Sequence, residues 1–536
     1  MKQIRYTKSI STILVLALSA IAISCTRKGK VDYDLNIDET LRWNIVSEPP
    51  TLDSTLSNDT TSGRVLDALM AGLTRYSFKD GEVSTEPSLA SSWQVTPDQK
   101  TFTFTLRSDA KWTDGVPFTG QQVIDGWKRL LTKKTGSEYA NFLFNVKNAQ
   151  DFYEGKITDF AQVGIKLSDD KQKLIVQLEQ SQSYFPSLLA HQATYPIRID
   201  LIEKFGDKYT EAANYQSLGP YKLKIWDHDK AVVLERNDGY FGKKAKTKYI
   251  LGRVVGEAST ALNMFKKGEL DALDTIPKVE TESIRQMKEY RLQPSLAVYY
   301  YELHTNVKPF DDLRVRKAIN MAIDREEINK VVGGTKIPAY NIVPPGLVGH
   351  DASIGLKFNA AAARKLLDEA GYKDRSTFPH IKLGLNTDEN HQRIAENVQA
   401  QLKRNLGIEI EILNEEWKTY LKATGTNKYN FHRFAWVGDY PDADTFINLF
   451  VTNGGNNKTR WGSAKYDELV KKGLSEGDKE KRKQIYGQAM RLLNEEEVPV
   501  IPIYYYRDEY LISNRVKNYP LNMMFKFYPE DIELVK

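Results

Sequence analysis

The chain contains a ten-residue stretch, Arg433-Phe-Ala-Trp-Val-Gly-Asp-Tyr-Pro-Asp442, that joins a strand pattern to a turn carrying a carboxylate. Alternating side chains from Tyr429 to Val437 predict a strand, which Gly438 and the residues after it end with turn chemistry. In α/β proteins, ligands bind at the carboxyl ends of strands, where one fixed charge can orient them. Asp439 is therefore a candidate ligand-binding residue. The simpler alternative is a solvated aspartate in a strand-ending turn.

The segments before this stretch alternate between strand and helix patterns. Strands are expected at 380–385 and 408–413, with a helix to about 405 between them and another around 417–421. Alternation with short loops favours a parallel α/β sheet.

The rest of the chain adds further strands and a few helices. Strands are expected at 41–46, 101–106, 173–178, 221–226, 231–235, 249–255, 500–506 and 509–512. Helices are expected from about residue 61, after Thr119, at 261–268 and at 310–328, and a boundary is expected at 299–306.

Composition limits the class of protein. At 536 residues the chain is too long for one hydrophobic core, so two or three lobes are expected. With 41% hydrophobic and 27% charged residues, it matches soluble globular proteins rather than disordered or polytopic membrane proteins. Lysines and acids are interleaved along the chain, which excludes the basic stripe of a nucleic-acid-binding protein.

The N-terminus has the pattern of an export signal. Lys2, Arg5 and Lys8 precede an apolar run at 13–23, which is short for a membrane span. Ala22-Ile-Ser-Cys25 resembles a bacterial lipobox, in which the cysteine becomes the lipidated first residue of the mature protein. We therefore expect a lipoprotein signal peptide at 1–24, lipidation at Cys25 and a polar tether at 25–34. An accidental cysteine after a plain signal peptide is the alternative. Cleavage would lower the formal charge from +5 to +2.

Catalytic and metal-binding signatures are missing from the sequence. Neither a His-Glu-x-x-His motif, a Cys-x-x-Cys motif nor a phosphate-binding loop is present. Gly473-Leu-Ser-Glu-Gly477 matches a nucleophile-elbow string, but the residues before it favour a helix rather than the required strand. The seven histidines lack ligand-like spacing, so neither a metal nor a cofactor is expected.

Seven short strings occur together in a characteristic order. They are Glu48-Pro-Pro-Thr-Leu-Asp53; Leu89-Ala-Ser-Ser-Trp93 with Lys100-Thr-Phe-Thr-Phe-Thr-Leu-Arg107; Ala110-Lys-Trp-Thr-Asp-Gly115; Leu218-Gly-Pro-Tyr221; Phe310-Asp-Asp-Leu-Arg-Val-Arg-Lys-Ala318 with Ala322-Ile-Asp-Arg325; Glu416-Trp-Lys-Thr-Tyr420; and Trp436-Val-Gly-Asp-Tyr-Pro-Asp442. With these strings, nearly the whole mature chain resembles the oligopeptide- and dipeptide-binding proteins of bacterial ABC importers, the family 5 extracellular solute-binding proteins.

The resemblance implies an α/β, three-lobed fold of the periplasmic-binding-protein type II kind. Lobe I would comprise 35–75, 196–305 and 491–536, lobe II 76–195 and lobe III 306–490. Two hinge segments would let the lobes enclose the ligand. Members hold a peptide extended, with its backbone hydrogen-bonded to a strand segment on each side.

The resemblance also implies the roles of particular residues. Asp439 would pair with the α-ammonium of the ligand, while Arg433 and His391 would meet its carboxylate. The remaining expected contacts are the backbone of Ala435, Trp436 and Val437, the backbone of Asn58, Asp59 and Thr60, the wall residue Tyr139 and the pocket aromatic Trp417. Thr424 replaces an arginine of the enterobacterial binders, which leaves the preferred peptide length open.

The expected function is capture of short peptides for import by a monomeric protein. Its partners would be an ABC permease with its ATPase, and it would touch the membrane only through the lipid. Another ligand of the family, such as a murein tripeptide, nickel chelate, opine or haem, is the first alternative. A peptide-sensing receptor would look identical in sequence, and an envelope hydrolase is the alternative from a different class.

Overall fold

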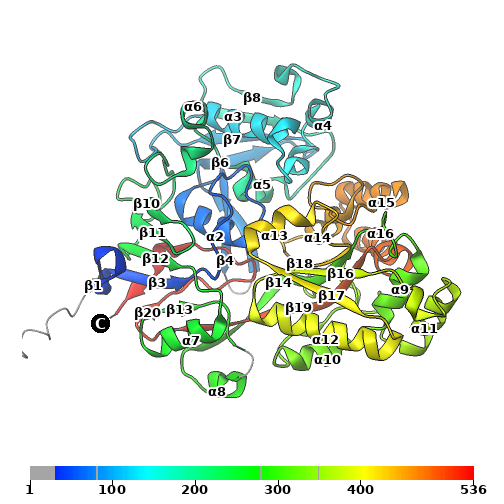
Figure 1. Cartoon of the computed structure of the whole chain (residues 1–536). Helices are drawn as coiled ribbons and strands as arrows, with labels where there is room; N and C mark the ends of the chain where they lie inside the picture. The colour runs from blue at the N-terminus through cyan, green and yellow to red at the C-terminus, as the bar shows by residue number, and fades with distance from the viewer. Residues whose placement is uncertain (1–29, 80–81, 278–279, 348, 536) are drawn as a thin grey trace, which may run out of the picture.

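The computed structural model describes residues 30–79, 82–277, 280–347 and 349–535 (Figure 1). The expected signal peptide and Cys25 lie outside these ranges. Within them, no helix combines the length and apolar character needed to cross a membrane.

One mixed sheet of eleven strands forms the centre of the molecule. Its order is β10 (Tyr221–Asp227), β11 (Ala231–Arg236), β12 (Tyr249–Arg253), β3 (Thr40–Asn44), β13 (Ala272–Leu273), β19 (Val500–Ile512), β14 (Tyr290–Leu303), β18 (Phe431–Val437), β16 (Ile381–Asn386) and β17 (Ile410–Glu415), with β15 (Ile337–Pro338) beside β19.

The parallel pairing expected among the strands of 380–437 holds for β16 and its two neighbours, and β3 also pairs in parallel with β12 and with β13. β16 pairs in parallel with β17 and with β18, whereas β18 pairs antiparallel with β14, and β14 antiparallel with β19. The expected boundary at 299–306 contains the end of β14 at Leu303, and it stays a prediction. The two strands expected at 500–506 and 509–512 form one continuous strand, β19. Asp508 is buried within β19, where it accepts a hydrogen bond from Ser295 of β14.

Fifteen α-helices surround the sheets in the described part of the chain. They are α2 (Thr60–Leu69), α3 (Gly120–Leu131), α4 (Ala149–Tyr153), α5 (Phe185–Leu188), α6 (Ile199–Phe205), α7 (Ala258–Lys266), α8 (Thr281–Arg285), α9 (Leu313–Met321), α10 (Arg325–Val331), α11 (Ala360–Glu369), α12 (Glu389–Leu406), α13 (Trp417–Thr424), α14 (Asp444–Ile447), α15 (Ala464–Ser475) and α16 (Lys479–Arg491). The single helix expected at 310–328 is divided into α9 and α10, because Asp324 caps a new helix start.

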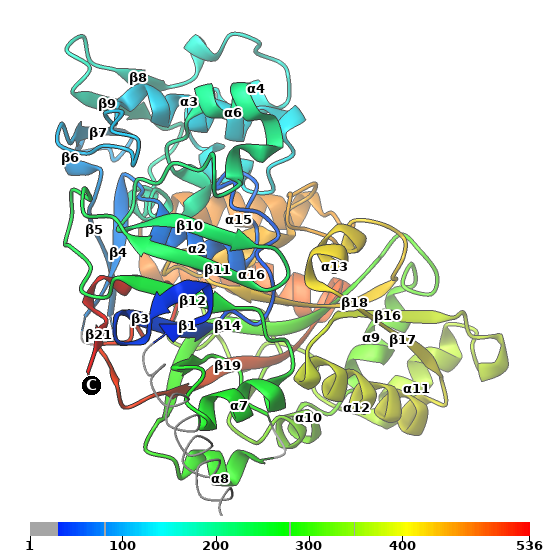
Figure 2. The ribbon, with the colours of Figure 1, turned by 60° about the vertical axis from the view of Figure 1, so that its left-hand side comes forward.

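A second, four-stranded antiparallel sheet lies at one end of the molecule. It consists of β6 (Ala90–Val95), β7 (Thr101–Leu106), β9 (Lys173–Gln177) and β8 (Ile165–Leu167), and α3 packs beside it. Figures 1 and 2 show this sheet apart from α9, α11 and α12, which lie at another end. β4 (Thr74–Lys79) and β5 (Glu82–Pro87) form a separate hairpin. The division into three lobes stays a prediction.

Small paired strands occupy both ends of the described chain. β1 (Lys30–Val31) pairs with β2 (Leu35–Asn36), so the later part of the expected tether is a hairpin. Near the C-terminus β20 (Val516–Lys517) pairs with β21 (Glu533–Leu534).

Two helices cover opposite faces of β16. Leu383 and Leu385 pack in the same hydrophobic cluster as Ile394, Val398 and Leu402 of α12. On the other face α13 lies over Gly384, whose carbonyl accepts a hydrogen bond from the Tyr420 hydroxyl. A Cβ built at Gly384 would lie 2.5 Å from the Tyr429 ring. Only glycine fits between this strand and that ring.

We therefore expect Gly384→Val to lower the free energy of unfolding by about 1–3 kcal/mol through overpacking. The measurement is urea unfolding without added ligand. Gly487→Ala is the control, since a Cβ there meets nothing within 4 Å and the site lies in α16; it should raise stability by up to about 1 kcal/mol. An unchanged unfolding midpoint for Gly384→Val would contradict this packing.

Candidate ligand-binding site

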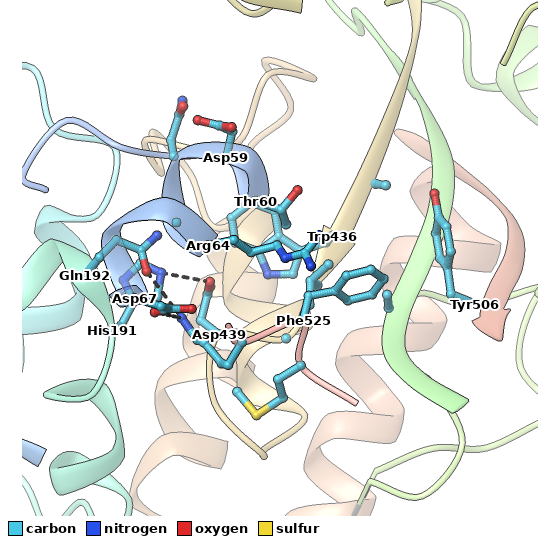
Figure 3. A pocket seen from close by; sticks show the side chains of 18 of the residues that line it. Asp59, Thr60, Arg64, Asp67, His191, Gln192, Trp436, Asp439, Tyr506 and Phe525 are labelled. Atoms are coloured by element: carbon cyan, nitrogen blue, oxygen red, sulfur yellow. Dashed lines mark hydrogen bonds and ion pairs between the residues drawn. The ribbon is translucent and has the colours of Figure 1, made fainter. Parts of the chain in front are cut away.

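A cavity of about 220 Å³ lies among α2, β18 and the segment 524–526 (Figure 3). An adjoining cavity of about 250 Å³ shares part of its wall with it, namely Thr60, Arg64, Trp417, Arg433, Tyr506 and Phe525. Together they form one elongated space. Asp439 lies at one end of the first cavity, and Tyr506 lies toward the other end.

The first cavity brings together ten of the eleven residues expected to bind ligand. These are Asn58, Asp59, Thr60, Tyr139, Trp417, Arg433, Ala435, Trp436, Val437 and Asp439. His391 lines the adjoining cavity beside Arg433. Residues more than 350 positions apart in sequence thus share one wall, although their roles toward a ligand stay predictions.

Asp439 is held rigidly at the turn after β18. Its backbone N–H donates to the Thr445 hydroxyl at 2.9 Å, and its carbonyl accepts from the Tyr76 hydroxyl at 2.5 Å. Carboxylate oxygen Oδ1 accepts from the Tyr139 hydroxyl at 3.3 Å and lies 3.2 Å from Nε2 of His191. Within the described chain no lysine or arginine pairs with Asp439. The carboxylate is buried, oriented by neutral donors and available to a cation.

The sequence analysis missed His191, which lies in the wall beside Asp439 (Figure 3). It caps a short 3₁₀ helix (Gln192–Thr194), and its Nδ1 accepts the Ala193 N–H at 3.3 Å. Burial lowers the pKa of His191, an effect that the neighbouring Asp439 partly offsets. No spacing in the sequence relates residue 191 to residue 439.

A buried ion pair beside Asp439 was also missed. The Lys526 ammonium lies 3.6 Å from Asp67 Oδ1 and donates to Gln192 Oε1 at 3.3 Å. Burial raises the pKa of Asp67, while Lys526 works in the opposite direction. An acid in the buried half of α2 was the available signal for Asp67. Lys526 lies near the C-terminus, and no pattern in the sequence pointed to its contact with Asp67.

Arg433 provides the opposite charge toward the far end. Its guanidinium donates to Asn386 Oδ1 at 3.0 Å and to the Tyr506 hydroxyl at 3.3 Å, and it lies 4.8 Å from the centre of the Tyr299 ring. Its Nε has no acceptor, and no carboxylate pairs with Arg433 within the described ranges. Burial lowers the pKa of nearby His391 well below its usual value, and Arg433 adds to this effect.

Between these charges, β18 presents an edge toward the cavity. β16 pairs with β18 only at Phe431 and His432. The carbonyl of Arg433 faces away from β14 and accepts from the Tyr420 hydroxyl, whereas the Gly438 N–H points to β14. Because antiparallel strands alternate, the backbone groups of Ala435 and Val437 face the same edge as Arg433. An extended chain can pair there.

Side chains from distant segments meet across the cavity. Trp417 Nε1 donates to Asp59 Oδ1 at 3.3 Å, and burial raises the pKa of this aspartate. On the same side Asn58 donates to Glu138 at 2.6 Å, and Glu138 pairs with Lys458. These contacts close the wall opposite the edge of β18.

Two other kinds of site, a metal centre and a nucleophile elbow, can be compared with the structure. They contain no group of three or more His, Cys, Asp or Glu side chains placed to hold a metal ion. The nucleophile-elbow string begins inside α15, and a Cβ at Gly473 would lie 2.0 Å from the Tyr486 ring. The string is therefore a helix end packed on an aromatic ring, as the sequence indicated.

Comparison with known proteins identifies a family and close structural relatives. The family model "Bacterial extracellular solute-binding proteins, family 5 Middle" matches residues 84–458. The oligopeptide-binding protein OppA of Bacillus subtilis is 35% identical over 95% of both chains. A structure of Haemophilus influenzae OppA in complex with the peptide RPPGFSPFR superposes with a TM-score of 0.88 at 29% identity, covering 94% of this chain and all of that one.

Two structures of one relative differ in how well they match. The Escherichia coli murein tripeptide-binding protein MppA superposes with a TM-score of 0.88 at 30% identity, covering 94% of this chain and 99% of that one. Its unliganded open form reaches only 0.62 at 31% identity, covering 95% and 99%. The second structure is described as unliganded and open, so the arrangement of this chain matches the open form less well.

The unpaired charge of Arg433 leads to a prediction about stability. Arg433→Met should leave the free energy of unfolding unchanged or raise it by up to about 2 kcal/mol, because a buried cation without a counter-ion is removed. Urea unfolding without ligand measures this.

The control for that measurement is Arg325→Met. Arg325 is 1% exposed, against 7% for Arg433, and has no carboxylate partner in the described ranges either, but it donates to the backbone carbonyls of Pro502, Asn320 and Ile323. Its loss leaves these buried acceptors unsatisfied and should cost about 3 kcal/mol. A comparable loss in Arg433→Met would show that Arg433 stabilises the unliganded fold.

Proposed function

The chain belongs to the family 5 bacterial extracellular solute-binding proteins, which bind solutes rather than catalyse reactions, and we propose that it captures short peptides for an ABC importer. The observation that carries this proposal is the pair of buried charges that lack counter-ions, the carboxylate of Asp439 and the guanidinium of Arg433. A free peptide carries the complementary charges at its two ends. Relatives named for oligopeptide and murein tripeptide binding support the assignment.

The peptide lies extended along the open edge of β18. Its α-ammonium pairs with Asp439, its backbone pairs with Ala435 and Val437, and its carboxylate meets Arg433 near His391. The four residue steps from Arg433 to Val437 span about 13 Å, the length of about four extended residues. We expect a preference for peptides of about three to five residues. The backbone and the ends supply the affinity, so side-chain preference is weak.

Binding involves closure of lobes around the ligand. Lobe II (76–195) supplies Tyr139 and His191, and lobe III (306–490) supplies Trp417 and β18. The contacts across the cavity and the poorer match to the open form of MppA support a closed state. A ligand that contacts both walls stabilises the closed state, because it can contact both walls only when the lobes have closed.

The protein acts outside the cytoplasm, in the periplasm or cell envelope. The lipobox-like sequence ending at Cys25 supports export and attachment to a membrane by lipid alone. Relatives described as periplasmic support the same compartment. The partners are an ABC permease and its ATPase, and the binding protein acts as a monomer.

Asp439→Asn tests the peptide assignment. We expect it to weaken binding of trialanine by about 2–5 kcal/mol, because the buried ammonium loses its counter-charge. Calorimetry on trialanine and N-acetyl-trialanine with both proteins forms a double-mutant cycle, in which acetylation should cost affinity only with the wild type. Asp98→Asn, on an exposed turn, is the control. Equal affinity of Asp439→Asn and wild type for trialanine would refute the assignment of Asp439.

Cys25→Ser tests the anchor. The full-length variant should move from the membrane fraction to the soluble fraction of the cell envelope, because a serine cannot carry the thioether-linked lipid. Cell fractionation followed by immunoblotting measures the shift, with Ser24→Ala as the matched neighbouring change. Retention of Cys25→Ser in the membrane fraction would eliminate the lipid anchor.

A further inference from the structure

The ring of His191 is held in one orientation by protein contacts on all sides. Its ring is 2% exposed and is enclosed by Tyr139 and Phe142, whose ring centres lie 4.5 and 5.0 Å away. On one edge Nδ1 accepts the Ala193 N–H, and on the other Nε2 lies 3.2 Å from Asp439 Oδ1. The ring therefore bridges a backbone donor and the carboxylate.

These two contacts determine which nitrogen of neutral His191 carries the proton. Since Nδ1 accepts, the hydrogen of the neutral ring is on Nε2 and points at Oδ1 of Asp439. A second proton would have to enter at Nδ1, where the Ala193 N–H already points. Protonation of the ring thus breaks one hydrogen bond and sets two donors against each other.

Charged and titratable groups face the ring from four elements. Asp439 follows β18, Tyr139 precedes a 3₁₀ helix (Ala140–Leu143), Asp67 belongs to α2 and Lys526 lies in the C-terminal segment. Burial lowers the pKa of His191 below its usual 6.5, and Lys526 acts in the same direction. Asp439 and Asp67 oppose this effect, because they favour the charged imidazole. Tyr139 remains protonated because burial and Asp439 raise its pKa well above 10.

We propose that His191 is a positioning residue for the ammonium subsite, and that the subsite accepts an amine only while His191 is neutral. This inference rests on the proposed peptide binding. The neutral ring and the Tyr139 hydroxyl both donate to Oδ1, and the Thr445 hydroxyl donates to Oδ2 at 3.4 Å. Together these donors fix the carboxylate plane, and Oδ2 keeps a second lone pair for the ligand. An imidazolium would neutralise Asp439 at 3.2 Å and compete with the ligand ammonium for it.

The sign of the pH dependence follows from this competition. Binding of an ammonium disfavours a proton on His191, so a proton on His191 equally disfavours the ammonium. Affinity for a free amino terminus is then complete at neutral pH. It falls as the pH drops below 6.5 through the lowered pKa of His191.

The experiment is calorimetry of trialanine binding from pH 7.5 to 4.5 with four proteins. They are the wild type, His191→Gln, His191→Leu and the control His380→Gln, which removes a surface histidine far from the cavity. Glutamine keeps a donor without titrating, whereas leucine keeps the bulk without a donor. Thermal unfolding at each pH verifies that every protein is folded.

We expect the wild type and His380→Gln to lose more affinity than His191→Gln as the pH falls from 7.5 to 4.5. Asp59, whose pKa is raised by burial, is shared by all the proteins and contributes to every profile. Asp67 interacts with His191, so any change in its titration belongs to the effect of His191. At pH 7.5, His191→Leu should bind at least tenfold more weakly than the wild type, and His191→Gln should recover part of that loss.

Superimposable pH profiles for the wild type and His191→Gln would overturn the role of His191 while leaving peptide capture intact. If His191→Leu does not fold, the pH profiles of the wild type and His191→Gln alone test the proposal. Failure of the wild type to bind trialanine at pH 7.5 would instead overturn the proposed function, and this inference with it.

Discussion

The carboxylate of Asp439 is buried among neutral hydrogen-bond donors rather than beside a cation. A tyrosine hydroxyl, a threonine hydroxyl and a neutral imidazole orient it without cancelling its charge. A lysine in their place would occupy the carboxylate permanently. Neutral donors leave the carboxylate available, which is a condition for the reversible binding of a cation that we propose.

Arg433 is the cationic counterpart of Asp439, because it too is buried and hydrogen-bonded without a counter-ion. It donates to an amide and a phenol and packs on an aromatic ring, yet its charge is not neutralised by any carboxylate in the described ranges. We expect two such charges, on one strand and the turn after it, to lower the stability of the unliganded protein. Under the proposed function, the two ends of a peptide pair with them. The neighbouring Lys526 and Asp67 differ, because they pair with each other.

The sheet explains how these groups reach one cavity. β14 and β19 are unusually long strands that cross the molecule, and β18 is paired along its full length on one side only. The unpaired edge would normally invite aggregation, but here it lines an enclosed cavity. Residues from 58 to 60, 139, 191 and 417 complete the wall opposite that edge.

The sequence alone determined many of the local elements and drew attention to one candidate binding residue. Alternation predicted β7, β16 and β18, Thr119 marked the start of α3, and the turn after Val437 singled out Asp439, because these signals depend only on neighbouring residues. Tertiary structure decided the mixed strand directions and the continuity of β14 and β19, since burial of residues such as Asp508 depends on partners far along the chain. It also decided the roles of His191, Asp67 and Lys526. Their contacts with one another and with Asp439 join segments hundreds of residues apart, and no spacing within the sequence encodes such a meeting.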